Sequence, residues 1–140
     1  MTIKEIQEEI VDEFSMFDDW MERYEHLIAL GKSLPLIESQ YKTDENIIKG
    51  CQSKVWVHGE LQADKVVFTA DSDAILTKGL VALLLRVFSN RSPREILDAD
   101  TKFIDDIGLK EHLSPTRANG LLSMVKQLKL YALAFQSKLA

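Results

Sequence analysis

The chain contains a single cysteine, Cys51, whose neighbours are not those of a packing residue. It lies in the polar stretch 49–54 (KGCQSK), and the apolar run 55–57 (VWV) starts only after that stretch has ended. A structural free cysteine behaves as a small hydrophobe and usually lies inside an apolar run. A thiol on a glycine-containing bend before a strand is instead placed to react. The sequence therefore makes sulfur chemistry at Cys51 the leading hypothesis, against the alternative of an incidental thiol near a turn.

Other chemistries find little support in the residue types and their spacing. The three histidines, His26, His58 and His112, are far apart in the sequence, and neither Cys-x-x-Cys nor His-x-x-x-His spacing occurs, so we expect no metal site. The triplet 71–73 (DSD) lacks the later glycine and glutamate of a calcium-binding loop, and we expect its oxygens to cap the following helix. No glycine pattern for nucleotide phosphates is present. The sequence leaves a hydrolytic Cys–His pair open and offers nothing in its favour.

Length and charge narrow the class of protein. A chain of 140 residues fits one domain, residues 1–140, that can fold without a metal or a disulfide. The net charge of −5 gives no basic footprint for nucleic acid or an anionic membrane. The N-terminus is no apolar signal segment, and no run approaches the roughly 20 apolar residues of a membrane span. Because a lone cysteine also implies no oxidising compartment, we expect a cytoplasmic protein.

The elements that must position Cys51 begin with helices at both ends of the chain. Residues 2–5 form a capping-box pattern, and apolar residues recur at helical spacing over 3–17. A second helix is expected to begin near residue 18 or 19 and to stop at Gly31. Serine-proline pairs at 92–93 and 114–115 mark two further helix starts. The second of these helices should run to about residue 138.

The middle of the chain changes to the period of strands. Segments 53–61 and 65–70 are rich in Val, Phe and Trp and are separated by 62–64 (QAD), which predicts a hairpin. A short extended piece at 46–48 is expected to add a third strand. The run 74–88 is too long and apolar for a surface helix, so we expect it to be buried against the sheet. The sequence thus predicts an α+β fold in which a small antiparallel sheet of about three strands packs against helices.

The segment 49–56 (KGCQSKVW) resembles the active-site segment of the SufE/CsdE family of sulfur-acceptor proteins. The likeness continues, in the right order, through 19–24, 41–46, 70–74 (ADSDA), 78–80 (KGL) and 113–121 (LSPTRANGL). It spans the chain from about residue 14 to the end and implies a single SufE-like domain with an IscU-like α+β fold. The strand after Trp56 and the 98–112 connection follow no pattern that can be carried over, which leaves the downstream sulfur acceptor open.

The resemblance also implies a function. Members of the family dock on a pyridoxal-phosphate (PLP) cysteine desulfurase (SufS/CsdA-like), accept its sulfur as a persulfide and deliver it to an iron–sulfur scaffold (SufBCD-like) or another acceptor. By residue-for-residue match, Cys51 is the sulfur acceptor and Arg117 contacts the desulfurase, whereas Gly50, Gln52 and Ser53 shape the loop. PLP belongs to the partner, so no cofactor is expected here. The chain would be a covalent carrier that stimulates the desulfurase rather than a stand-alone enzyme.

Alternatives and details stay open at this point. A non-covalent adaptor for the desulfurase or for another sulfur-relay pathway is the second interpretation, and a metal or cluster scaffold is the third. Gly50 is expected to have a positive φ, Trp56 to be core, and the stem of Lys78 to carry its ammonium to solvent. The sequence does not distinguish a monomer from a homodimer, nor a buried Cys51 from an exposed one.

Overall fold

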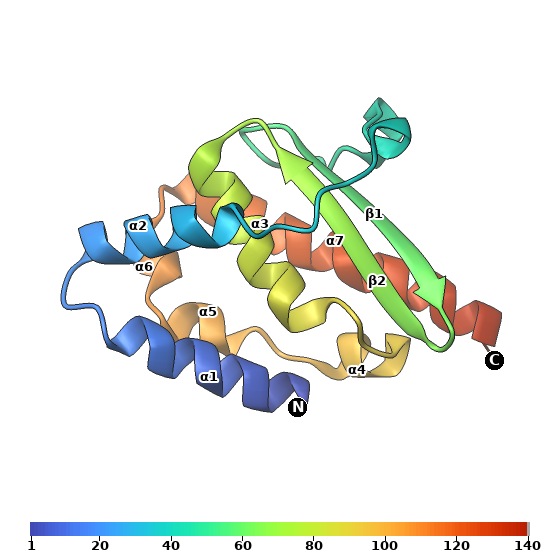
Figure 1. The fold of residues 1–140 in the computed structure, drawn as a ribbon, viewed down its shortest axis with the longest axis horizontal. Coiled ribbons are helices and arrows are strands. Elements are labelled where there is room, and N and C mark those ends of the chain that lie inside the picture. The colour runs from blue at the N-terminus through green and yellow to red at the C-terminus, as the bar shows by residue number, and fades with distance from the viewer. Residues whose placement is uncertain (140) are drawn as a thin grey trace.

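The computed structural model describes residues 1–139, which form seven α-helices, two short 3-10 helices and a two-stranded sheet (Figure 1). The elements follow in the order α1 (Ile3–Ser15), α2 (Trp20–Gly31), η1 (Ser39–Tyr41), η2 (Asp44–Asn46), β1 (Val55–Gln62), β2 (Lys65–Ser72), α3 (Ile75–Phe88), α4 (Pro93–Asp98), α5 (Lys102–Asp106), α6 (Leu109–His112) and α7 (Pro115–Leu139).

The predicted starts of α1, α2, α4 and α7 are confirmed, and a side chain caps each of these helices. Thr2 and Glu5 bond each other's backbone N–H groups at the start of α1, and an equivalent capping box begins α4. Asp19 and Ser114 cap α2 and α7, each accepting a bond from the N–H group three residues on. These bonds satisfy donors that a helix leaves without an intrahelical partner. No helix within residues 1–139 is long and apolar enough to cross a membrane.

The predicted hairpin is also confirmed. β1 and β2 pair antiparallel over their whole length, from Val55 opposite Ser72 to Gln62 opposite Lys65. One face of the hairpin is buried, because Val55, Val57, Val66, Phe68 and Ala70 point into the core. Figure 1 shows α3 and α7 packed on this side of the sheet. The α+β fold class predicted from the sequence is therefore present, and α3 is the buried helix that was expected.

The third strand does not form. Asp44–Asn46 adopts a 3-10 turn, so the expected strand is reduced to an isolated bridge between Ile47 and Trp56 beside β1. The outer edge of β2 is occupied by other backbone and side-chain groups, and its outward N–H groups find partners there. They pair Val66 with the Arg91 carbonyl, Phe68 with the Ser89 hydroxyl, and Ala70 with the Pro35 carbonyl.

α2 and α3 cross where two glycines meet. A Cβ atom on Gly79 would lie only 2.1 Å from the carbonyl oxygen of Leu27, and one on Gly31 would lie 3.0 Å from the Gly79 nitrogen. α2 ends at Gly31, as predicted, but the next residue, Lys32, keeps a right-handed helical conformation. Gly31 therefore allows close packing of the two helices rather than a left-handed cap. This crossing fixes the start of α3, which borders the Cys51 loop.

Candidate functional site

Cys51 lies on the loop that leads from η2 into β1, and its thiol is half-buried. The thiol donates a weak bond to the carbonyl oxygen of Gly120 on α7, with Sγ 3.6 Å away. Burial raises the pKa of the Cys51 thiol, because desolvation disfavours the charged thiolate. In this conformation the sulfur is therefore held as a protonated thiol against α7.

A small cavity of about 10 Å³ adjoins the sulfur, which is room for roughly one water molecule. Three elements far apart in the sequence supply its walls. They are the loop (Cys51, Gln52 and Ser53), the start of α3 (Thr77 and Leu80) and the start of α7 (Arg117, Gly120 and Met124). The structure thus brings together Cys51, Gln52, Ser53 and Arg117, four of the five site residues predicted from the sequence.

Gly50, the fifth predicted residue, forms the bend before Cys51. Its φ is +91°, as predicted, in a region that residues with a side chain rarely adopt. A Cβ atom there would also lie 2.7 Å from the hydroxyl oxygen of Ser123 on α7. The bend that turns Cys51 inward therefore favours glycine mainly because of its positive φ, since the Ser123 hydroxyl is the end of a side chain that can shift.

Thr77, Leu80, Gly120 and Met124 were not predicted as site residues. Thr77 is a buried polar residue on a mostly apolar helix that also carries Lys78 and Arg86, and its polar side chain within the apolar run 74–88 was a signal in the sequence. Gly120 lay within the segment that carries the family resemblance but had no role assigned to it. Its carbonyl faces the thiol only because α7 packs beside the loop, a contact that spacing along the chain does not reveal.

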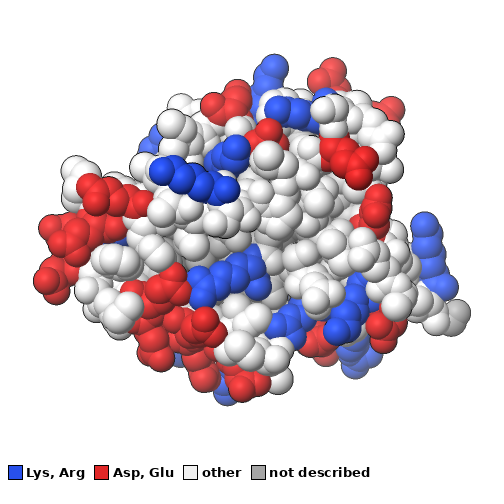
Figure 2. All heavy atoms as spheres, in the orientation of Figure 1, with Lys and Arg blue, Asp and Glu red and all other residues white. Residues whose placement is uncertain are grey.

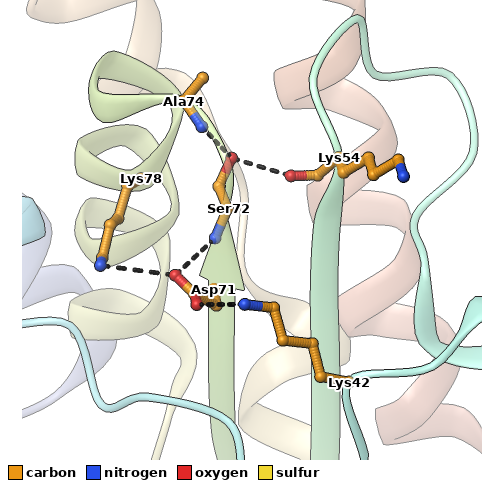
Figure 3. Close-up of polar contacts among 6 residues, drawn as sticks. All are labelled: Lys42, Lys54, Asp71, Ser72, Ala74 and Lys78. Atoms are coloured by element: carbon orange, nitrogen blue, oxygen red, sulfur yellow. Dashed lines mark hydrogen bonds and ion pairs between the residues drawn. The ribbon is translucent and has the colours of Figure 1, made fainter. Parts of the chain in front are cut away.

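The end of the Cys51 loop is fastened to the end of β2 (Figure 3). The Ser72 hydroxyl donates to the Lys54 carbonyl at 2.9 Å and accepts from the Ala74 N–H at 3.3 Å. The Lys54 N–H donates to Oδ1 of Asp73 at 3.0 Å. The prediction that the acidic triplet caps α3 is wrong, because the N-cap of α3 is Ala74 and no side chain bonds it as a cap. The triplet's oxygens hold the loop instead, since Lys54 offers them unpaired backbone groups.

Two lysines converge on Asp71 at the same end of β2. Lys42 Nζ lies 3.0 Å from Oδ2 and Lys78 Nζ lies 3.4 Å from Oδ1. Burial acts to raise the pKa of Asp71, but the bonds from Lys42 and Ser72 and the charges of both lysines outweigh it, and the pKa is lowered. Lys78 was expected to extend its ammonium group into solvent, but that group pairs with Asp71 instead. Trp56 was expected in the core, yet it is half-buried with Lys42 Nζ 4.6 Å from its ring centroid.

The histidines are placed by aromatic contacts. His58 stacks on Tyr41 and His112 stacks on Trp20, with ring centroids 3.6 and 3.8 Å apart. His26 lies against Phe14 and bonds the carboxylate of Glu13. Within residues 1–139, no three or more His, Cys, Asp or Glu side chains gather as a metal site would require.

The raised pKa predicts slow alkylation of Cys51 in the free protein. An ordinary thiol is about 3% ionised at pH 7, and the folded protein should contain less thiolate than this. The rate of reaction with iodoacetamide should rise with pH as the thiol ionises. The midpoint of this rise should lie above that of the urea-denatured chain, whose thiol should have a pKa of about 8.5. A folded-state midpoint below that of the denatured chain would contradict the buried, protonated thiol.

Comparison with known proteins places this geometry in a family context. A model of the family described as SufE, an Fe–S metabolism associated domain, matches residues 8–132. An uncharacterized SufE-like protein of Rhizobium meliloti (strain 1021) is 41% identical over 127 residues, covering 87% of this chain and 91% of the relative. SufE-like protein 1, chloroplastic/mitochondrial, of Arabidopsis thaliana is 43% identical over 132 residues. Those residues make up 94% of this chain but 36% of that longer relative.

A solved structure supports the fold in the same way. The solution structure of a hypothetical protein from Thermus thermophilus superposes with a TM-score of 0.79, covering 94% of this chain and 96% of the other. The two sequences are 19% identical, so the likeness speaks for the α+β arrangement of helices and hairpin alone.

Proposed function

The chain belongs to the SufE family, whose domain is associated with Fe–S metabolism, and on this basis we propose that it carries sulfur from a PLP-dependent cysteine desulfurase to an iron–sulfur scaffold. The observation that supports the proposal is the position of Cys51. The only cysteine of the chain is turned inward on a glycine bend, beside a cavity lined by the loop, α3 and α7. PLP remains with the desulfurase in this proposal.

The transfer is an exchange at sulfur. The Cys51 thiolate attacks the outer sulfur of the persulfide on the desulfurase cysteine, and a bond forms between Sγ and that sulfur. The sulfur–sulfur bond of the donor breaks, and its electron pair leaves with the donor thiolate, which takes up a proton. The proton of the Cys51 thiol is lost before attack. No external oxidant or reductant is needed, because one sulfur–sulfur bond replaces another.

We propose that docking, rather than an acidified thiol, makes Cys51 competent. Lowering a thiol pKa from about 8.5 to about 7 raises the thiolate fraction roughly fifteen-fold, but the loss of nucleophilicity leaves a net gain of about three-fold. Alignment of reacting groups contributes far more, with effective molarities of about 10⁵ M or above. Because the half-buried thiol lies against the Gly120 carbonyl, docking in this proposal moves the loop so that the thiol leaves Gly120 and enters the partner's site.

The ends of the moving segment follow from the geometry of the loop. Gly50 supplies the flexible bend on one side, and Lys54 is fastened to the end of β2 on the other. Gln52 and Ser53 lie between these two points. Arg117 is exposed on the first turn of α7 and lines the cavity, which suits the contact to the desulfurase that the resemblance implies. These loop-shaping and partner-binding roles are part of the proposal.

Intact-mass analysis after mixing the protein with a cysteine desulfurase and free cysteine tests the proposal. We expect a species heavier by one sulfur, about 32 Da, that maps to Cys51 and persists without an acceptor, because no second cysteine can resolve it. Faster cysteine turnover without the added mass would instead favour the non-covalent adaptor. The carrier would be refuted if the protein gained no mass and did not speed turnover. Immediate covalent dimerisation would also refute it. The cytoplasmic location also remains a proposal, since the Arabidopsis relative is named chloroplastic/mitochondrial.

A further inference from the structure

Five basic side chains border the Cys51 loop, and we call them the basic rim. Two belong to the loop, one lies at the start of α7, and two form ion pairs with Asp71. They are Lys49, Lys54, Arg117, Lys42 and Lys78. Asp71 and Asp73 lie among them, and Asp44 and Glu45 of η2 bound the rim next to Lys42 along the chain. Even with these four carboxylates counted, the rim is net positive, whereas the chain as a whole has a net charge of −5.

Stability does not account for the pair of lysines on Asp71. The side chains of Lys42 and Lys78 are 39% and 32% exposed, and ion pairs of such exposed lysines add little to the stability of a fold. One carboxylate also cannot neutralise two ammonium groups, so a positive charge is left over. Because Asp71 is only 18% exposed, the lysines rather than the carboxylate present this charge to an approaching surface.

Basic and acidic side chains are unevenly distributed on the face shown in Figure 2. In Figure 2, Lys and Arg side chains lie over the start of α3 and the upper end of β2, with carboxylates among them, and further basic groups lie across the middle and lower right of the view. Asp and Glu side chains crowd the left and lower-left edges, over α2 and α1. Such an arrangement orients a charged partner during approach, since rim charges act mainly on the association rate.

We infer that the basic rim is the docking surface for an acidic surface on the sulfur donor, and that Lys42 and Lys78 speed the encounter. The inference rests on the proposed function and adds the charge of the partner's contact surface. The rim surrounds the loop that carries Cys51, so a donor attracted to it meets the thiol. The lysines take no part in the chemical step, because their ammonium groups are engaged by Asp71 rather than by the sulfur.

The rate of association with the desulfurase at low salt tests the inference. Lys42→Glu combined with Lys78→Glu should slow association about ten-fold, and the deficit should shrink in high salt because screening weakens the attraction. The matched control is Lys4→Glu combined with Lys126→Glu. It changes the net charge equally, on α1 and in the groove between α7 and α4, and should leave the rate within about two-fold. Asp71→Asn removes a negative charge from the rim and should speed association by about two-fold.

The outcomes separate this inference from the proposed function. Equal association rates for all variants, or equal slowing by the control pair, would overturn the docking role of the rim while the sulfur adduct still forms on Cys51. Absence of the adduct in the unaltered protein would refute the carrier itself. Thermal melts identify a variant that has lost its fold. In that case the salt dependence of the unaltered protein decides, because an attractive rim requires slower association as salt rises.

Discussion

A Cys51→Ser variant will gain no sulfur from the desulfurase, and the species heavier by about 32 Da will fall to the detection limit of the intact-mass measurement. A serine hydroxyl is not ionised at neutral pH and forms no persulfide. The replacement is nearly isosteric, and the half-buried group makes a single weak bond, to the Gly120 carbonyl. The free energy of unfolding should therefore change by no more than about 1 kcal/mol, which urea titration would show.

The same variant separates the carrier from the adaptor. A carrier that lacks its thiol should no longer accelerate cysteine turnover by the desulfurase, since each cycle would end with the persulfide still on the donor. Cys51→Ala serves as the paired control, because it also removes the hydroxyl and must give the same result. Full stimulation by both variants would contradict the covalent mechanism and favour a recruitment module.

Gly79→Ala will destabilise the fold more than the same substitution at the other two helical glycines, Gly31 and Gly120. The added Cβ would lie 2.1 Å from the Leu27 carbonyl oxygen and 2.6 Å from its carbon, both backbone atoms of α2. The two helices must move apart, and overpacking of this kind costs about 3 kcal/mol. At roughly 3–5 °C per kcal/mol for a domain of this size, the melting temperature should fall by about 10 °C.

Gly120→Ala is the matched control for this prediction. It adds the same methyl group to a helix interior, but the nearest atom to the new Cβ is 3.4 Å away, an ordinary contact. Alanine is favoured over glycine inside helices by up to about 1 kcal/mol, so stability should stay the same or rise slightly. If Gly79→Ala melted at the temperature of the unaltered protein, the close approach of α2 and α3 would be disproved.

Local signals in the sequence predicted the parts of the fold that depend on neighbouring residues. The capping pair Thr2 and Glu5 and the hairpin turn at 62–64 form within a few residues, and both are present. The prediction of a third strand was wrong because Asp44–Asn46 forms a 3-10 turn, which leaves an isolated bridge between Ile47 and Trp56. The prediction that residues 71–73 cap α3 was wrong because the Lys54 backbone, which is distant in sequence, bonds the Asp73 and Ser72 side chains instead.

The residues of the candidate site also differ in whether local sequence or tertiary packing identifies them. Cys51 and Gly50 could be identified from residue type and order, because a thiol on a polar bend and a glycine with positive φ are local properties. The role of Gly120 could not, since its carbonyl meets the thiol only through the packing of α7. Family likeness supplied Arg117, and the structure places it on the same cavity. Sequence order alone contains no measure of that proximity.

The outer edge of β2 limits how other molecules can recognise this protein. Its outward N–H groups at Val66, Phe68 and Ala70 all have partners within the chain. Recognition by strand addition needs a row of free backbone groups, and aggregation through sheet edges needs the same. The edge of β2 is closed to both, so an incoming polypeptide cannot extend the sheet there, and specificity on that side must come from side chains.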